Sequence, residues 1–270
     1  MLVDSITVET STVCNARCII CPNQFCPRRS HMMPLDEFEN ILHFFPGLKG
    51  VVLCGMYEPL LDPRFESILD IIERLQPKAE ITIFTNGSAL THEKAVLLRD
   101  HYPNFKNLIV SIHGFSKQVY ETVMVGLNRD EVYKNVMDFA NLIGDSSYFH
   151  LSVSFVRVKQ NIGELEAYRK FWQTVRRVDV VSDFEVVNWQ GQVPVENLYY
   201  ELPQHTRECP MFEKPLVIDA YGNVVLCCYN FRQNYGHVLE GGYAKWLNKV
   251  RVSSTYPLPE CEKCNGWRHY

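Results

Sequence analysis

Three cysteines near the N-terminus, Cys14, Cys18 and Cys21, have a spacing that suits a metal cluster with an open coordination position. They follow an alternating segment at residues 6–10, which predicts a strand, and they lie in one loop with the pattern C-x3-C-x2-C. A [4Fe–4S] cluster is normally held by four cysteine thiolates, so three from one loop leave one iron without a protein ligand. Structural zinc needs four ligands, and disulfide frameworks are typical of short secreted chains. The spacing therefore predicts a reactive iron–sulfur centre.

A second group of cysteines lies in the last quarter of the chain. Residues 216–226 read as a β-hairpin with a Gly-Asn turn, which would bring Cys227 back towards Cys209. A helix near residues 243–250 would then deliver Cys261 and Cys264 to the same place. Four such thiolates suit either zinc or an iron–sulfur cluster. The group consists of Cys209, Cys227, Cys228, Cys261 and Cys264.

Between the two cysteine groups, apolar periodicity predicts six strands that alternate with helices. This order favours βαβ units and a parallel sheet, and six units are fewer than the eight of a closed TIM barrel. Sites in such sheets lie at the carboxyl ends of the strands, where Cys14, Glu58, Asn86 and the segment 111–113 are expected. The strands are expected at residues 6–10, 50–53, 80–87 including a turn, 107–113, 151–158 and 180–187. The helices are expected at residues 35–45, 65–75, 91–101, 117–124, 131–143 and 162–175.

With these motifs the chain resembles the radical S-adenosylmethionine (radical SAM) enzymes. The resemblance implies an α/β fold with a partial (β/α)6 TIM-like barrel over residues 1–195. It also implies that the free iron of the cluster chelates the methionine end of SAM. An electron from the cluster then cleaves SAM, and the 5′-deoxyadenosyl radical removes a hydrogen atom from the substrate. Such a reaction needs an external one-electron reductant, for example flavodoxin or ferredoxin.

The resemblance also implies a set of residues that bind SAM. Gly55, Met56, Tyr57 and Glu58 stand where the family has a Gly-Gly-Glu-Pro-like stretch, whose backbone and acidic residue hold the ammonium group of SAM. Tyr57 replaces the second glycine, so a side chain stands where the backbone usually approaches the ligand. An ordinary strand-to-helix loop is the alternative reading of this segment.

Polar residues at the ends of later strands extend this expected site. In the family, residues at the positions of Asn86 and Ser111 face SAM, Ser111 towards the methionine carboxylate, and His113 shares the face of Ser111. Arg157 could meet a carboxylate of SAM or of the substrate with its bidentate fork, or it could be a surface salt-bridge residue. Both interpretations of Arg157 stay open.

The C-terminal residues 196–270 resemble the auxiliary-cluster module of radical SAM enzymes in its shortened twitch form, related to the longer SPASM domain. The resemblance implies a second [4Fe–4S] cluster held by Cys209, Cys227, Cys261 and Cys264, with zinc as the alternative. The predicted cofactors are therefore two [4Fe–4S] clusters and SAM.

The short chain is most similar to small twitch dehydrogenases that act on aminocyclitols such as 2-deoxy-scyllo-inosamine. This resemblance implies oxidation of a secondary alcohol of a cyclitol or sugar, with His113 or Glu185 as the base and Arg157 orienting the substrate. The second hypothesis is epimerisation of a sugar or peptide with Cys228 as hydrogen donor. A non-catalytic metal-binding or electron-transfer module is the third, and it predicts iron without SAM cleavage.

Composition excludes several other classes of protein. The net charge of −4 gives no global basic field for nucleic acid, and no apolar run approaches the roughly 18 residues of a membrane span. The N-terminus has no basic segment followed by an apolar one, so no signal peptide is expected. Ten cysteines without an export signal point to metal binding in a reducing compartment, and we expect a cytoplasmic protein.

Overall fold

The computed structural model describes residues 3–144, 149–199 and 216–252, together with Cys261 and Cys264. Six parallel strands alternate with helices along the chain, as the periodicity predicts. These strands are β1 (Ser5–Val8), β2 (Gly50–Leu53), β3 (Glu80–Thr85), β4 (Phe105–Ser111), β5 (His150–Arg157) and β6 (Val178–Glu185). Each pairs in parallel with its neighbours in chain order, which confirms the α/β class and the parallel sheet core.

Three of the helices begin at a side chain that accepts hydrogen bonds from otherwise unpaired backbone N–H groups. Thr91, Ser116 and Asn128 accept such bonds at the starts of α4, α5 and α6. The helices are α1 (Pro22–Phe25), α2 (Leu35–Phe44), α3 (Phe65–Leu75), α4 (His92–His101), α5 (Lys117–Val123), α6 (Arg129–Ile143), α7 (Leu165–Thr174) and α8 (Gly242–Val252). Short 3-10 turns are η1 (Pro59–Leu61), η2 (Ile162–Glu164), η3 (Val195–Asn197) and η5 (Val238–Glu240). No helix of the described residues is long and apolar enough to cross a membrane.

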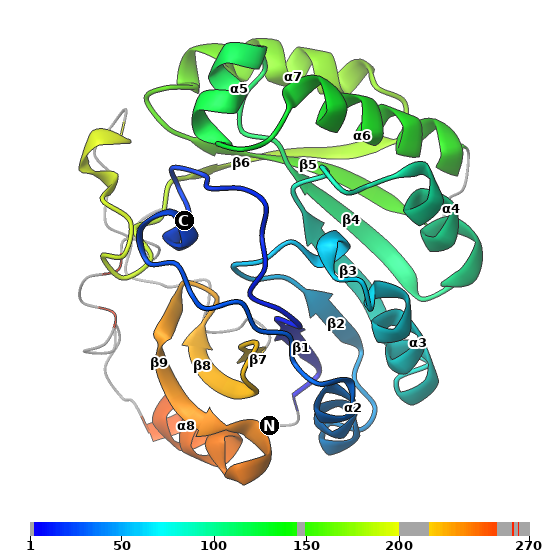
Figure 1. Ribbon diagram of the computed structural model, residues 1–270, viewed down its shortest axis with the longest axis vertical. Coiled ribbons are helices and arrows are strands. Elements are labelled where there is room, and N and C mark those ends of the chain that lie inside the picture. Colours follow the sequence, from blue (N-terminus) through cyan, green and yellow to red (C-terminus); the bar gives the residue numbers. More distant parts are fainter. Residues whose placement is uncertain (1–2, 145–148, 200–215, 253–260, 262–263, 265–270) are drawn as a thin grey trace.

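The sheet curves, with its helices on the outer side and the loop after β1 on the inner side (Figure 1). Alternate strand residues such as Leu151, Val153 and Phe155 are fully buried and belong to the main hydrophobic core. The intervening residues Ser152 and Ser154 face the inner side, where they line a cavity. The period of two in each strand therefore separates the packed core from the site.

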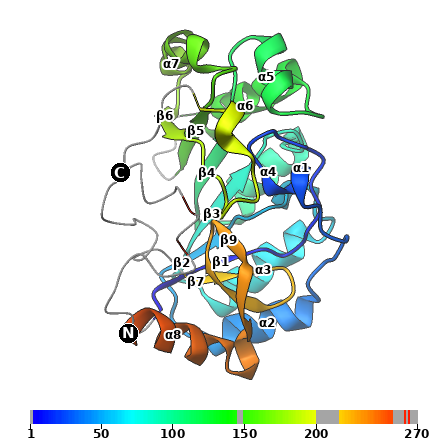
Figure 2. The ribbon, with the colours of Figure 1, turned by 90° about the vertical axis from the view of Figure 1, so that its left-hand side faces the viewer.

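The C-terminal strands continue the same sheet. β7 (Leu216–Ile218) pairs in parallel with β1, and β8 (Asn223–Cys227) and β9 (Asn230–His237) follow as antiparallel neighbours. The complete order is β6-β5-β4-β3-β2-β1-β7-β8-β9. Figure 2 shows β7 to β9 next to β1, with α8 below them. The predicted hairpin and late helix are confirmed, and the sheet partner of the hairpin is the first strand of the chain.

Side chains also join the C-terminal strands to the N-terminal segment. His237 Nε2 lies 3.0 Å from a carboxylate oxygen of Glu37 in α2. The ring of Tyr221 stacks on His31, with 4.5 Å between the ring centroids. Gly222 lies so close to these groups that an added Cβ would be 2.3 Å from Glu37 Oε1 and from His237 Nε2. The hairpin turn therefore needs glycine for close approach as well as for its φ of 73°.

Candidate functional site

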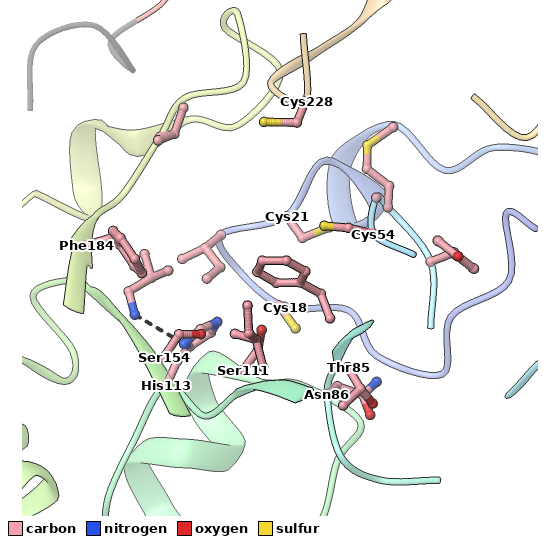
Figure 3. Close-up of a pocket in the computed structure, with 18 of the residues that line it drawn as sticks. Cys18, Cys21, Cys54, Thr85, Asn86, Ser111, His113, Ser154, Phe184 and Cys228 are labelled. Carbon is pink, nitrogen blue, oxygen red and sulfur yellow. Dashed lines mark hydrogen bonds between the residues drawn. The ribbon is translucent and has the colours of Figure 1, made fainter. Parts of the chain in front are cut away.

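A cavity of about 650 Å³ on the inner face of the sheet contains most of the predicted site residues. Its wall is made by alternate residues of β1 to β7, by the cysteine loop after β1 and by the end of β8 (Figure 3). The predicted residues that line it are Cys14, Cys18, Cys21, Gly55, Met56, Tyr57, Glu58, Asn86, Ser111, His113, Glu185, Cys227 and Cys228. Of the other predicted residues, Arg157, Cys261 and Cys264 are described but do not line it, and Cys209 lies outside the described residues.

The cysteine loop is held in place by the end of α5. Backbone N–H groups of Arg17 and Ile19 donate to the carbonyls of Val125 and Val123, at 2.7 and 3.0 Å. The Arg17 guanidinium donates to the carbonyls of Cys14 and Ala16, at 3.0 and 2.8 Å. These bonds fix the loop backbone, so its three thiols keep their positions along the cavity.

The chemistry of the three thiols fits an iron–sulfur cluster. Burial raises the pKa of Cys14, raises that of Cys18 well above its usual value, and raises that of Cys21 to about 11. Metal binding requires the thiolate form and releases these protons. Thiolates are soft ligands, and they suit the iron of an iron–sulfur cluster. No three His, Cys, Asp or Glu side chains of the described part converge on a single metal-ion position. A four-iron cluster takes one thiolate per iron, so its ligands need not converge on one point.

Glu58 joins the end of β3 to the turn that follows β2. Its Oε1 accepts hydrogen bonds from the Thr85 hydroxyl at 2.6 Å and from Leu60 N–H at 3.1 Å, and its Oε2 accepts from Asn86 N–H at 2.6 Å. The residue is 2% exposed, and burial raises the pKa of its carboxyl to about 7, against these hydrogen bonds and the charge of Lys94. A carboxylate oxygen has two acceptor positions, so Oε2 keeps one for a cationic ligand.

We expect this raised pKa to make stability depend on pH in the metal-free protein. The folded-state pKa of Glu58 lies above its unfolded value of 4.5, so the stabilisation is complete below pH 4.5 and is lost as the pH rises through about 7. The loss is on the order of 3 kcal/mol, from about 1.4 kcal/mol per pKa unit. Urea unfolding of the wild type and of Glu58→Gln between pH 4.5 and 8 measures it. Equal pH slopes for the two proteins would contradict the assignment to Glu58.

Gly55 packs directly against a buried carboxylate. A Cβ at this position would lie 2.3 Å from Glu9 Cγ and 2.4 Å from Glu9 Oε1. Glu9 Oε1 also accepts a hydrogen bond from the backbone N–H of Met56. Glycine is therefore required at position 55 by the close approach to Glu9. The backbone N–H of Met56 already donates a hydrogen bond to the same carboxylate.

Glu9 and Arg28 form a buried ion pair that the sequence interpretation did not include in the site. The pair is bidentate, with distances of 2.7 and 2.9 Å, and the Glu9 side chain is 0% exposed. Arg28 also donates to the carbonyl of Met56 at 3.2 Å and lies 5.7 Å from the ring centroid of Phe231 in β9. The pair thus connects the cysteine-loop segment with β1, β2 and the C-terminal strands. The sequence offers one signal for Glu9: it is a charged residue at the end of a strand in which apolar residues alternate.

Asn86 links the end of β3 to the cysteine loop. Its side-chain N–H donates to Asn15 Oδ1 at 3.0 Å, and the same nitrogen lies 4.0 Å from Cys14 Sγ. Its Oδ1 accepts from the backbone N–H and the hydroxyl of Ser88. The amide is therefore oriented by its neighbours, with its N–H side towards the cysteines.

His113 and Ser111 line the same cavity, in agreement with their predicted common face. β4 ends at Ser111, so His113 lies just beyond the strand and not within it as expected. His113 Nδ1 accepts a hydrogen bond from Val156 N–H at 3.1 Å, and burial lowers its pKa to about 4. The imidazole is therefore neutral at neutral pH.

Arg157 forms ion pairs within the sheet. Its guanidinium nitrogens lie 3.2 Å from Asp183 Oδ1 and 2.7 Å from Glu185 Oε1, both in β6. Arg169 of α7 makes a further ion pair with Asp183. Of these residues Glu185 lines the cavity. The described geometry of Arg157 is thus that of the salt-bridge interpretation, with one of its partners at the site.

The second cysteine group approaches the same cavity from the C-terminal strands. Cys227 and Cys228 line it, and Figure 3 shows Cys228 on the side of the space opposite Ser111 and His113. Cys261 is buried against Leu226, the residue before Cys227. The backbone N–H of Cys264 donates to the carbonyl of Cys261 at 2.9 Å. Of the four thiols predicted to hold an auxiliary cluster, three are thus on or beside the end of β8.

Comparison with known families gives one match. The family model described as "Radical SAM superfamily" matches residues 8–168, which is more than half of the chain. A comparison with curated proteins gives no match.

Several solved structures share the fold. Streptococcus suis SuiB bound to precursor peptide SuiA has a TM-score of 0.73 at 16% identity, covering 99% of this chain and 70% of that chain. BtrN in complex with AdoMet and 2-DOIA has a TM-score of 0.56 at 18% identity, covering 93% of this chain and 84% of that chain. Native anSMEcpe with bound AdoMet and Cp18Cys peptide has a TM-score of 0.63 at 14% identity, covering 92% of this chain and 81% of that chain. At these identities the likeness concerns the fold.

Proposed function

Because this chain belongs to the radical SAM superfamily, we propose that it oxidises a secondary alcohol of a small polar cyclitol or sugar. The family implies a [4Fe–4S] cluster and SAM, whose chemistry is the reductive cleavage of SAM and removal of a carbon-bound hydrogen. Residues 1–195 act as a partial (β/α)6 barrel in this proposal, and residues 196–270 as a twitch-like auxiliary domain. A one-electron reductant such as flavodoxin or ferredoxin supplies the electron, in a reducing compartment such as the cytoplasm.

The residues at and beside the cavity divide into three functional groups in this proposal. Cys14, Cys18 and Cys21 hold the first cluster. The SAM-binding residues are Gly55, Met56, Tyr57, Glu58, Asn86 and Ser111. Glu58 has an acceptor position for the ammonium group, and the hydrogen bonds from Thr85 and Asn86 keep its carboxylate oriented. Arg157 holds Glu185 at the cavity through their ion pair of 2.7 Å. We therefore assign proton acceptance from the substrate hydroxyl to Glu185, and orientation of that carboxylate to Arg157.

The observation that carries the proposal is the common cavity of the two cysteine groups. Cys227 lines the space that also contains Cys14, Cys18 and Cys21. A second cluster held by Cys209, Cys227, Cys261 and Cys264 would border the substrate and could take its second electron, which oxidation requires. The fold neighbours BtrN with 2-DOIA, SuiB with peptide SuiA and anSMEcpe with the Cp18Cys peptide support a small molecule or short peptide as the substrate.

Epimerisation is the second candidate function, and the position of Cys228 favours it. The Cys228 side chain lies at the cavity, where a thiol could return a hydrogen atom to a substrate carbon (Figure 3). In that case the product has the composition of the substrate. The thiol gives up a hydrogen atom and becomes a thiyl radical, which one electron from the external reductant and one proton convert back to the thiol.

Reaction in heavy water separates the two functions. The reconstituted protein is supplied with SAM, reductant and 2-deoxy-scyllo-inosamine or myo-inositol, and the product is weighed by mass spectrometry. Oxidation gives loss of two hydrogens with no carbon-bound deuterium, whereas epimerisation gives unchanged composition with one carbon-bound deuterium. Iron binding without any 5′-deoxyadenosine would contradict both functions and support a non-catalytic electron-transfer module. Cys228→Ala is the matched variant, since only epimerisation should lose turnover.

A further inference from the structure

His113 is held by the backbone of β5 on one side of its ring. Val156 N–H donates to Nδ1 at 3.1 Å, so this nitrogen is an acceptor and carries no proton (Figure 3). The carbonyl of Ser154, which accepts from Ile112 N–H at 2.9 Å, also lies beside this ring. In a neutral imidazole one nitrogen accepts and the other donates, so the proton of His113 lies on Nε2.

A buried asparagine holds the backbone around this ring. Asn161 is 0% exposed, and its side-chain amide donates to the carbonyls of His113 at 3.0 Å and Val156 at 2.8 Å. Its Oδ1 accepts from Val158 N–H at 2.8 Å. Asn161 therefore ties the end of β4 to the end of β5, which fixes the distance between His113 and the N–H group that orients it.

Two serine residues line the same cavity as His113. Ser154 of β5 is in register with Ser182 of β6, and both line the cavity. Among the described residues, neither hydroxyl has a side-chain hydrogen-bond partner, and neither does His113 Nε2. Each of these three groups can donate a hydrogen bond to a ligand oxygen, and the two hydroxyls can also accept one.

The described residues of this wall include no Lys or Arg. The charged side chains that line the cavity, among the described residues, are the carboxylates Glu58 and Glu185. A phosphate or carboxylate group on a substrate would enter this space without an Arg or Lys partner, and burying an unpaired charge is costly. Hydroxyl and carbonyl oxygens, by contrast, match the donors that are present.

We propose that His113 Nε2–H, with the hydroxyls of Ser154 and Ser182, forms a donor wall that binds the oxygen functions of a substrate carrying no anionic group. The inference rests on the proposed function and assigns His113 a role as hydrogen-bond donor rather than as base. At the reacting carbon, a neutral imidazole donor would stabilise negative charge that develops on the oxygen during oxidation.

The tautomer can be tested without SAM or substrate. The reconstituted protein is labelled with 15N-histidine, and the long-range 1H–15N correlations of His113 are identified by their loss in His113→Gln. We expect the Nε2–H tautomer at pH 7. A protonated Nδ1, or an imidazolium, would overturn the proposal whether or not the protein cleaves SAM.

Paired substitutions test the role in turnover. Gln keeps an N–H donor near the position of Nε2 but cannot act as a base, whereas Leu removes the donor. We expect kcat/KM for myo-inositol or 2-deoxy-scyllo-inosamine to fall about 10²–10³-fold in His113→Leu, the usual effect of losing one such donor, and by much less in His113→Gln. Equal losses in the two variants would contradict a donor role. His150→Gln is the control, because His150 lies at the exposed start of β5.

The charge selectivity has its own measurement. Product formation with myo-inositol is compared with that from myo-inositol 1-phosphate. We expect the phosphate ester to be turned over at least tenfold more slowly, and comparable turnover of the two would overturn the exclusion of anionic substrates. Failure of all SAM cleavage in the wild type would instead contradict the proposed function, while the tautomer measurement would still decide the assignment of His113.

Discussion

Alanine at Cys14, Cys18 and Cys21 together is expected to abolish 5′-deoxyadenosine formation. These thiols come from one loop whose backbone is fixed by α5, and they line the cavity next to Glu58 and Asn86. Without them no iron can be held where SAM is expected to bind. Liquid chromatography of anaerobic reactions with dithionite measures the nucleoside. Retained SAM cleavage in the triple variant would refute the assignment of this loop.

The iron content of the same variant reports on the second cysteine group. The wild type should bind about eight irons per chain, from two clusters of four, and the triple variant about four. Four irons and one zinc in the wild type would contradict the auxiliary iron–sulfur cluster. Cys26→Ala is the matched control, because Cys26 caps α1 a few residues further on and does not line the cavity. We expect this control to keep both the iron and the nucleoside.

Replacement of Glu9 by alanine is expected to lower the free energy of unfolding by about 3 kcal/mol or more. Removing one partner of a buried ion pair costs about 3–5 kcal/mol, because the other charge stays buried without compensation. The Arg28 side chain is 18% exposed, so water reaches part of its charge and the lower end of that range applies. Met56 N–H would lose its acceptor as well. Urea unfolding of the metal-free protein measures the difference.

Two further variants isolate the effect of burial. Lys49 and Asp4 also approach to 2.7 Å, but their side chains are 77% and 60% exposed, so Asp4→Ala should leave the midpoint unchanged. The double variant Glu9→Leu, Arg28→Met should recover much of the stability lost in Glu9→Ala, because it leaves no unpaired charge. A double variant less stable than Glu9→Ala would argue that the pair stabilises the fold by its attraction.

The sequence predicted the alternating elements well, because each depends on local periodicity. β2 and α3 have the predicted bounds, and Thr91 caps α4 as expected. The three cysteines of the first loop were also identifiable, since their spacing is itself the signal. Residues that follow strands in a parallel sheet meet at one edge, which explains why Glu58, Asn86 and His113 line one cavity.

Contacts between distant segments were not predictable from local pattern. Nothing in the segments of Glu9 and Arg28 says that their side chains meet, and Arg28 lies in a loop with no periodicity. The pairing of β7 with β1 joins residues more than 200 positions apart, and a hairpin signal gives no information about its outer partner. The ring orientation of His113 depends on a backbone N–H of another strand, so its role as donor or base could not be chosen from the sequence.

The pairing of β1 between β2 and β7 has a consequence for the order of folding. During synthesis, β1 can pair with β2 once residues 50–53 have left the ribosome, but its second edge stays open until residues 216–218 have left it too. Contacts of such large sequence separation form slowly, since closing the long loop costs entropy before the contact is gained. An open strand edge is also a template for aggregation. The cysteine loop is synthesised early, but it follows β1, which gains its second neighbouring strand only when β7 is added. We therefore expect cluster insertion to come late, after the C-terminal strands have joined the sheet.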